Sequence, residues 1–267
     1  MLIDAHSHIH FKEHFSDVDA VIERAEQAGV KGQILIGCNV KDSNDVVDFV
    51  KSRRENHGQG NFACAIGVHP HDSIQLTVEV LKSFEDLVNK ENAGGIKTIA
   101  AIGEIGLDYF RNFQSEDIQK NAFMEQLKLA KKLDLPVVIH ERNAWVETME
   151  LLAEAGNKKV VLHSFTGGFK EAQECVDRGY FISFSGMLTY PKNDHLRDVT
   201  RIVPLDKFMV ETDCPYLPPQ IFRGQRNEPA YVVETAKEFA RVNDMEFEEV
   251  CKLSTANVEA FFGVSFS

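Results

Sequence analysis

Six side chains that can ligate a metal ion lie at the ends of short apolar runs: His6, His8, Glu104, His140, His163 and Asp213. His6 and His8 are two residues apart, so on a strand their side chains point to the same face. Four imidazoles and two carboxylates gathered at one place would be unstable without cations. Nitrogen and oxygen donors in this number suit zinc, manganese or magnesium. The site could hold one ion or two. We expect two, because one carboxylate can bridge a pair about 3.5–4 Å apart.

The elements that carry these residues alternate regularly between short β-branched runs and longer polar segments. The expected strands span residues 2–9, 32–38, 62–69, 98–106, 136–142, 159–165, 180–186 and 208–213. Apolar spacing predicts a helix through Phe123, Leu127, Ala130 and Leu133, and a second helix beginning at Pro229. Gly29 is expected to follow the end of the first helix.

Eight such βα units predict an α/β fold, a (β/α)8 TIM barrel, formed by residues 1–267 as a single domain. The alternative, an open doubly wound sheet, lacks the GxGxxG turn after an early strand. In a barrel the C-terminal strand ends form the active site, and all six candidate ligands lie there.

Composition limits the compartment and the partners. Five scattered cysteines without a CxxC pair are typical of a reducing compartment. The sequence has neither an apolar run of membrane-spanning length nor a signal-peptide core. We therefore expect a cytoplasmic protein with no membrane association and no obligate protein partner. The net charge of -12 argues against a broad nucleic-acid-binding face.

Residues beside the candidate ligands indicate the substrate. Arg142 shares a strand face with His140, and an arginine next to a metal site suits a phosphate or carboxylate group. His69, in the stretch GVHPH, is a candidate phosphate contact or proton donor, with a structural role as the alternative. Glu211 shares the face of Asp213, and Asp4 is expected to orient a ligand through a hydrogen bond.

The sequence resembles the TatD-type metal-dependent deoxyribonucleases through several motifs in order: DAHSHI, GVHPH, GEIGLDY, IHER, HSFTGG, FSG and ETDCPYLPP followed by RGQRNEP. The resemblance implies an amidohydrolase-like TIM barrel that hydrolyses DNA phosphodiester bonds, often as an exonuclease. It also implies two divalent ions. His6, His8, Glu104 and Asp213 would hold one ion, while Glu104, His140 and His163 would hold the other.

A mechanism follows as a hypothesis. A metal-activated water attacks phosphorus, Asp213 acts as general base, and Glu104 bridges the metals. Arg142 and His69 bind the substrate and stabilise its charge. The resemblance implies 3'-5' exonuclease activity. We expect it on single-stranded DNA or DNA ends, because an acidic chain binds duplex weakly.

Loops after the strands carry basic and aromatic side chains that could bind unpaired bases, with packing over the barrel as the alternative. The basic ones are Arg111, Lys192, Arg223 and Arg226, and the aromatic ones are Tyr109, Phe110, Tyr190, Tyr216 and Phe222.

Three other functions compete with this hypothesis. A cyclic-amide or ester hydrolase of the same scaffold commonly bridges its metals with a carboxylated lysine, whereas Glu104 stands at that position here. A phosphatase acting on small phosphoesters uses the same ligands. A non-enzymatic metal-binding scaffold is disfavoured by the intact ligand set and by Arg142.

Overall fold

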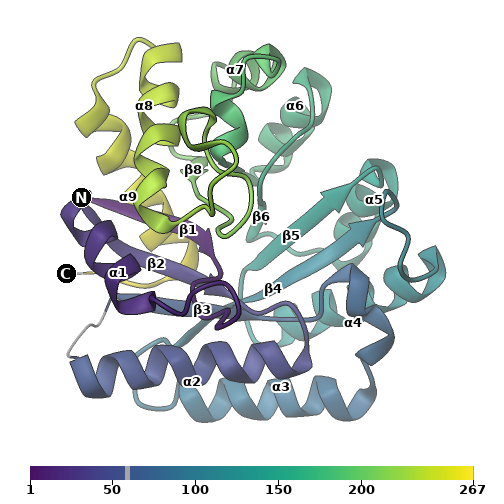
Figure 1. The fold of residues 1–267 in the computed structure, drawn as a ribbon. Coiled ribbons are helices and arrows are strands. Elements are labelled where there is room, and N and C mark those ends of the chain that lie inside the picture. The colour runs from purple at the N-terminus through teal and green to yellow at the C-terminus, as the bar shows by residue number, and fades with distance from the viewer. Residues whose placement is uncertain (58–60, 267) are drawn as a thin grey trace. The chain divides into compact units, whose positions relative to one another are not determined.

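The computed structural model describes residues 1–57 and 61–266 and contains all eight expected strands (Figure 1). They are β1 Leu2–Ser7, β2 Val30–Ile36, β3 Phe62–Ile66, β4 Ile99–Asp108, β5 Val137–Arg142, β6 Val160–Leu162, β7 Phe181–Phe184 and β8 Phe208–Val210. The strand order follows the chain from β1 to β8. The pairs β1–β2, β3–β4, β4–β5, β5–β6 and β7–β8 are parallel. This order is that of the predicted (β/α)8 barrel.

Helices alternate with these strands. They are α1 Val18–Gln27, α2 Val40–His57, α3 Val78–Glu91, α4 Glu116–Lys132, α5 Trp145–Ala155, α6 Phe169–Arg178, α7 Asp194–Thr200, α8 Val232–Val242 and α9 Phe247–Phe262. Short 3-10 helices span Pro70–Gln75, Gly186–Thr189, Gln220–Phe222 and Pro229–Tyr231.

The expected helices are present with small differences. Phe123, Leu127 and Ala130 are buried on α4, whereas Leu133 is the C-cap of that helix. The helix expected to begin at Pro229 starts as a 3-10 turn there and becomes α-helical at Val232. Gly29 follows α1 with a positive φ of 87°, as expected for a residue after a helix C-cap.

The chain divides into two compact units. The first comprises residues 1–35, 163–261 and 265–267, and the second comprises residues 36–162 and 262–264. The first unit thus contains β1, most of β2, β7 and β8, and the second contains β3 to β6. The prediction of a single domain stays a prediction.

In the first unit, the segment that follows β8 pairs with the end of β1. The amide of Asp213 donates to the carbonyl of His6, and the amide of His8 donates to the carbonyl of Cys214. An aromatic core lies behind these strands, where Phe208 of β8 stacks on Phe239 of α8 with ring centroids 4.1 Å apart. These backbone hydrogen bonds bring Asp213 next to His6 and His8.

In the second unit, two buried glutamines of α4 hold the ends of two strands. Gln126 accepts from the amide of Val68 and donates to its carbonyl, just after β3. Gln119 does the same for Asp108 at the end of β4. Gly106 of β4 has a φ of 145°, and a Cβ there would lie 2.0 Å from the carbonyl oxygen of His140. Only glycine therefore permits β4 to approach β5 so closely.

Within the described residues, no helix combines the length and the hydropathy that a membrane crossing requires. The cytoplasmic location stays a prediction.

Candidate active site

In the first unit, two imidazoles and a carboxylate converge. Nε2 of His6 and Nε2 of His8 lie 3.2 Å apart, and Oδ1 of Asp213 lies 3.7 Å from the former and 3.4 Å from the latter. Burial raises the pKa of Asp213, but the hydrogen bond from His8 and the charges of His6 and His163 outweigh it, so this pKa lies below the usual range. An ionised carboxylate facing two imidazole nitrogens is a donor set suited to a divalent cation.

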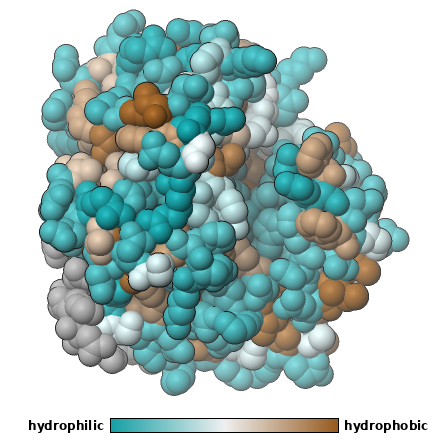
Figure 2. Space-filling model, viewed as in Figure 1, coloured by the Kyte–Doolittle hydropathy of each residue, from teal (hydrophilic) through white to brown (hydrophobic). Residues whose placement is uncertain are grey.

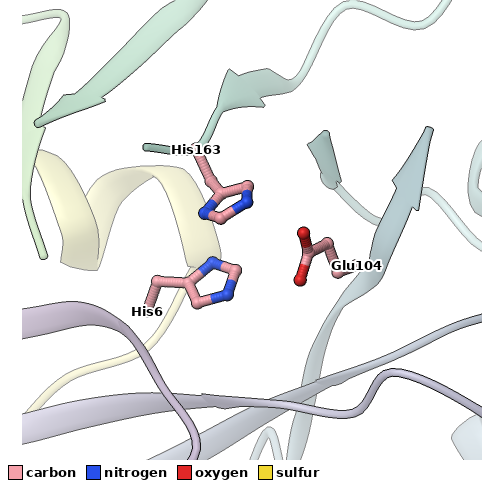
Figure 3. A group of neighbouring side chains, drawn as sticks. All are labelled: His6, Glu104 and His163. Atoms are coloured by element: carbon pink, nitrogen blue, oxygen red, sulfur yellow. The ribbon is translucent and has the colours of Figure 1, made fainter. Parts of the chain in front are cut away.

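His163 follows β6, and its ring stacks on that of His6 with centroids 4.0 Å apart (Figure 3). Nδ1 of His163 lies 3.1 Å from Oε1 of Glu211, which is buried. A carboxylate accepts hydrogen bonds, so Nδ1 carries the ring proton and Nε2 presents its lone pair. Such a carboxylate fixes the tautomer of a ligating histidine and raises the basicity of its other nitrogen.

A buried polar network holds the backbone around Asp213. The carboxylate of Asp4 accepts from the amides of His6 and Thr212 and from the Thr212 hydroxyl. Asn227 donates to the carbonyl of Thr212 at 2.8 Å. Asp213 follows with a φ of 58°, a left-handed conformation that aspartate tolerates. Asp4 therefore binds the backbone of His6 and Thr212 and the hydroxyl of Thr212. Burial raises the pKa of Asp4 to about 8.

In the second unit, His140 of β5 lies between two carboxylates of β4. Its Nδ1 is 2.7 Å from Oε1 of Glu104, which is drawn in Figure 3, and its Nε2 is 3.3 Å from Oδ2 of Asp108. The other oxygen of Asp108 accepts from the backbone amides of Phe110 and Arg111. When Nε2 donates to Asp108, the lone pair of Nδ1 faces Glu104.

Asp108 also binds a second imidazole. Its Oδ2 lies 2.8 Å from Nε2 of His71. Burial raises the pKa of Asp108, but hydrogen bonds from His140, the Arg111 amide and His71 outweigh it and hold the pKa below its usual range. The negative charge on Asp108 thus orients two histidines at once.

A histidine that binds a metal through Nε2 carries its ring proton on Nδ1, whereas His69 carries it on Nε2. Its Nδ1 accepts a hydrogen bond from the amide of His71 at 3.1 Å, so in the neutral ring the proton is on Nε2. That Nε2 lies 3.5 Å from Oε1 of Glu104. Although His69, Glu104 and His140 are close enough to share an ion, the orientation of His69 suits a hydrogen-bond donor.

Arg142, the last residue of β5, presents an uncompensated positive charge. Its guanidinium carbon lies 3.9 Å from the ring centroid of Phe110. Among the described residues, no carboxylate forms an ion pair with it. A guanidinium stacked on a ring keeps its N–H edge available for a phosphate.

The structure thus brings the predicted ligands together in two clusters, each within its own unit. His6, His8, His163 and Asp213 belong to the first, and Glu104 and His140 to the second. Imidazoles that have one nitrogen facing a carboxylate, as His163 and His140 do, fit divalent cations.

Sequence reasoning missed three neighbours of these ligands: Asp108, His71 and Cys38. The expected fourth strand ended at residue 106, whereas β4 continues to Asp108. Alternation from Glu104 could have identified Asp108. The Sγ atom of Cys38 lies 3.9 Å from Oε2 of Glu104, and no spacing pattern indicated it.

Residues 3–263 match the family model described as TatD related DNase. The chain belongs to this family. The uncharacterized metal-dependent hydrolase YabD of Bacillus subtilis is 34% identical over 99% of this chain and 100% of its own length. The 3'-5' ssDNA/RNA exonuclease TatD of Citrobacter koseri is 34% identical over 94% of each chain.

Solved structures of TatD proteins agree with this assignment. The Escherichia coli TatD homologue YjjV superposes with a TM-score of 0.87 at 29% identity, over 99% of this chain and 98% of that one. A TatD family hydrolase of Entamoeba histolytica gives a TM-score of 0.85 at 23% identity, which supports the fold. The predicted TIM barrel and the predicted family are confirmed, and the protein is a metal-dependent hydrolase.

Proposed function

We propose that this protein is a 3'-5' exonuclease that hydrolyses phosphodiester bonds in single-stranded DNA with two divalent ions. The observation that carries the proposal is the pair of ligand clusters with Arg142 beside one of them. A relative that is 34% identical is named a 3'-5' ssDNA/RNA exonuclease, which supports the same substrate class.

The ligand sets are proposed as follows. His6, His8, Glu104 and Asp213 would hold one ion, and Glu104, His140 and His163 would hold the other. Zinc, magnesium and manganese all suit nitrogen and oxygen donors of this kind. When bound, such ions activate water and neutralise charge on the phosphate.

The protein's own groups then handle the proton and the substrate. A carboxylate oxygen of Asp213 accepts the proton of the attacking water, whose oxygen forms a bond to phosphorus as one P–O ester bond breaks. Asp213 then passes the proton to the leaving oxygen, which becomes a hydroxyl group. The low pKa of Asp213 keeps this carboxylate ionised before the reaction. Asp108 and Glu211 keep His140 and His163 in their ligating orientations.

The substrate phosphate is bound by two donors. His69 donates from Nε2 to a non-bridging oxygen, and Arg142 binds the same group with its planar fork. Arg142 supplies a positive charge in a chain whose net charge is -12. The face drawn in Figure 2 is mostly hydrophilic. Such a protein favours a flexible single strand that can enter the site over the continuous backbone of a duplex.

The test uses purified protein freed of metal and then supplied with Mg²⁺, Mn²⁺ or Zn²⁺. Single strands labelled at the 5' end are expected to give a ladder that shortens one nucleotide at a time, whereas 3'-labelled strands release labelled mononucleotide at once. EDTA is expected to abolish both. A small phosphoester such as p-nitrophenyl phosphate serves as the competing substrate. Hydrolysis of it alone, with every oligonucleotide intact, would overturn the proposal.

A further inference from the structure

The loop between β4 and α4 exposes two phenylalanine rings beside the second ligand cluster. Phe110 is 56% exposed and Phe113 is 63% exposed. Large apolar side chains at this exposure lose most of the stabilisation that burial provides, so two within four residues call for an explanation.

Phe113 is connected to the ligand cluster through ring contacts. Its ring meets that of His71 edge to face, with centroids 4.8 Å apart. The ring of His71 in turn lies 4.3 Å from that of His69 and 6.2 Å from that of His140. Asp108 binds Nε2 of His71, so Phe113 packs on an imidazole whose orientation is fixed.

Phe110 supports the positive charge next to this cluster. Arg142 stacks on it at 3.9 Å, and the guanidinium carbon of Arg111 lies 6.0 Å from the same ring centroid. Phe110 of this loop therefore supports the positive charge of Arg142 on β5, and three residues further on Phe113 exposes its ring. A positive charge and an exposed aromatic ring suit a single-stranded nucleic acid, which offers a phosphate and an unpaired base in every nucleotide.

Several other aromatic and basic side chains in the loops after the strands are engaged within the protein, whereas Tyr216 is 50% exposed. Phe222 stacks on Tyr231 with centroids 3.7 Å apart, and the ring of Tyr190 is covered by Arg223. Arg226 forms an ion pair with Asp17 at 2.7 Å. These three side chains are thus packed within the protein, whereas Phe110 carries Arg142 and the ring of Phe113 is 63% exposed.

We propose that Phe113 stacks on an unpaired nucleobase of the substrate, while Arg142, supported by Phe110, binds a phosphate of the same strand. This inference rests on the proposed exonuclease function and assigns the residues that select an unpaired end. A base in a duplex is already stacked and paired, so the ring cannot use it without opening the helix.

The test combines a protein variant with a substrate variant. Phe113→Ala, Phe113→Trp and the wild type are compared by kcat/KM on single-stranded oligonucleotides that carry one abasic residue at the first, second or third position from the 3' end. For the wild type, one of these positions is expected to lower kcat/KM by about tenfold or more, within the range of about 5- to 150-fold that stacking supports.

Phe113→Ala is expected to lose this discrimination and to process the intact strand as slowly as the wild type processes the abasic one. Phe113→Trp is expected to restore it. The matched control is Ile96→Ala. Ile96 is 57% exposed and precedes the ten-residue strand β4, so it lies about 30 Å from the loop in question. This control is expected to behave as the wild type.

The outcomes separate the two claims. Equal rates for the wild type on intact and abasic strands would overturn the stacking role while leaving the nuclease function standing, and so would unchanged discrimination in Phe113→Ala. Absence of cleavage of any strand with any of the three metals would overturn both.

Discussion

Replacing Asp108 with asparagine tests how the second ligand cluster is held. One oxygen of Asp108 accepts from His71 at 2.8 Å and His140 at 3.3 Å, and the other accepts from two backbone amides at 2.9 and 2.8 Å. An asparagine has one accepting oxygen and one donating amide group. In either orientation its amide group faces donors, so His140 or the loop backbone loses its partner.

The expected magnitude follows from the role of such carboxylates. Removing an outer partner of a ligating histidine weakens metal binding by about 10- to 100-fold, or about 1.4–2.8 kcal/mol. Because Asp108 serves two histidines, we expect the upper part of this range. The kcat is expected to fall as well, because His140 no longer holds one tautomer.

The assay is a competition for Zn²⁺ or Mn²⁺ between the protein and a chromogenic chelator, with circular dichroism melting as the check on folding. Asp86→Asn is the matched control, since Asp86 is exposed on α3 and pairs only with Lys82 among the described residues. A folded Asp108→Asn protein that binds metal within twofold of the wild type would refute the reasoning.

Three further predictions follow. Asp213→Asn is expected to lower hydrolysis by at least about 100-fold with the fold intact, because asparagine also tolerates the φ of 58°; kcat and circular dichroism check this, and near-normal kcat would contradict it. Asn227→Ala removes bonds to the carbonyls of Thr212 and Tyr216 and is expected to cost about 2–4 kcal/mol in urea unfolding, with a loss below 0.5 kcal/mol as the opposing result. Hydrogen bonds from Arg226 hold the pKa of Asp17 below its ordinary value of about 4. The stability that ionised Asp17 contributes is therefore complete above pH 4 and is lost as the pH falls toward the folded-state pKa. Asp17→Asn should be less stable than the wild type at pH 6, with a smaller difference in unfolding free energy at pH 2–3, and a difference that grows in acid would disprove this.

The strands were predictable because they are short apolar runs, and several of them have a polar side chain at or near the end, such as His140 or Asp213. His6 and His8 follow alternation, and the structure places their Nε2 atoms together as that spacing predicts. The helix α9, by contrast, lies beyond the eighth βα unit and was not expected, although buried Val250 and Val258 are spaced as in a helix.

The partners of the ligands were harder to predict than the ligands themselves. His71 faces Asp108 because a 3-10 helix from Pro70 to Gln75 turns the chain just after β3, and no periodicity in GVHPH indicates that turn. Likewise, the tautomer of His69 depends on a hydrogen bond from a backbone amide, which sequence spacing alone does not reveal.

The most direct measurement is a metal titration of activity. Metal-free protein is mixed with rising amounts of the ion that supports the fastest cleavage, at a protein concentration above the dissociation constant. Release of 3'-terminal nucleotide from a single strand is then followed. The account predicts no release without metal and a rate that rises until two ions per chain are bound. Undiminished release by the metal-free protein, or a rate that is complete at one ion per chain, would contradict it.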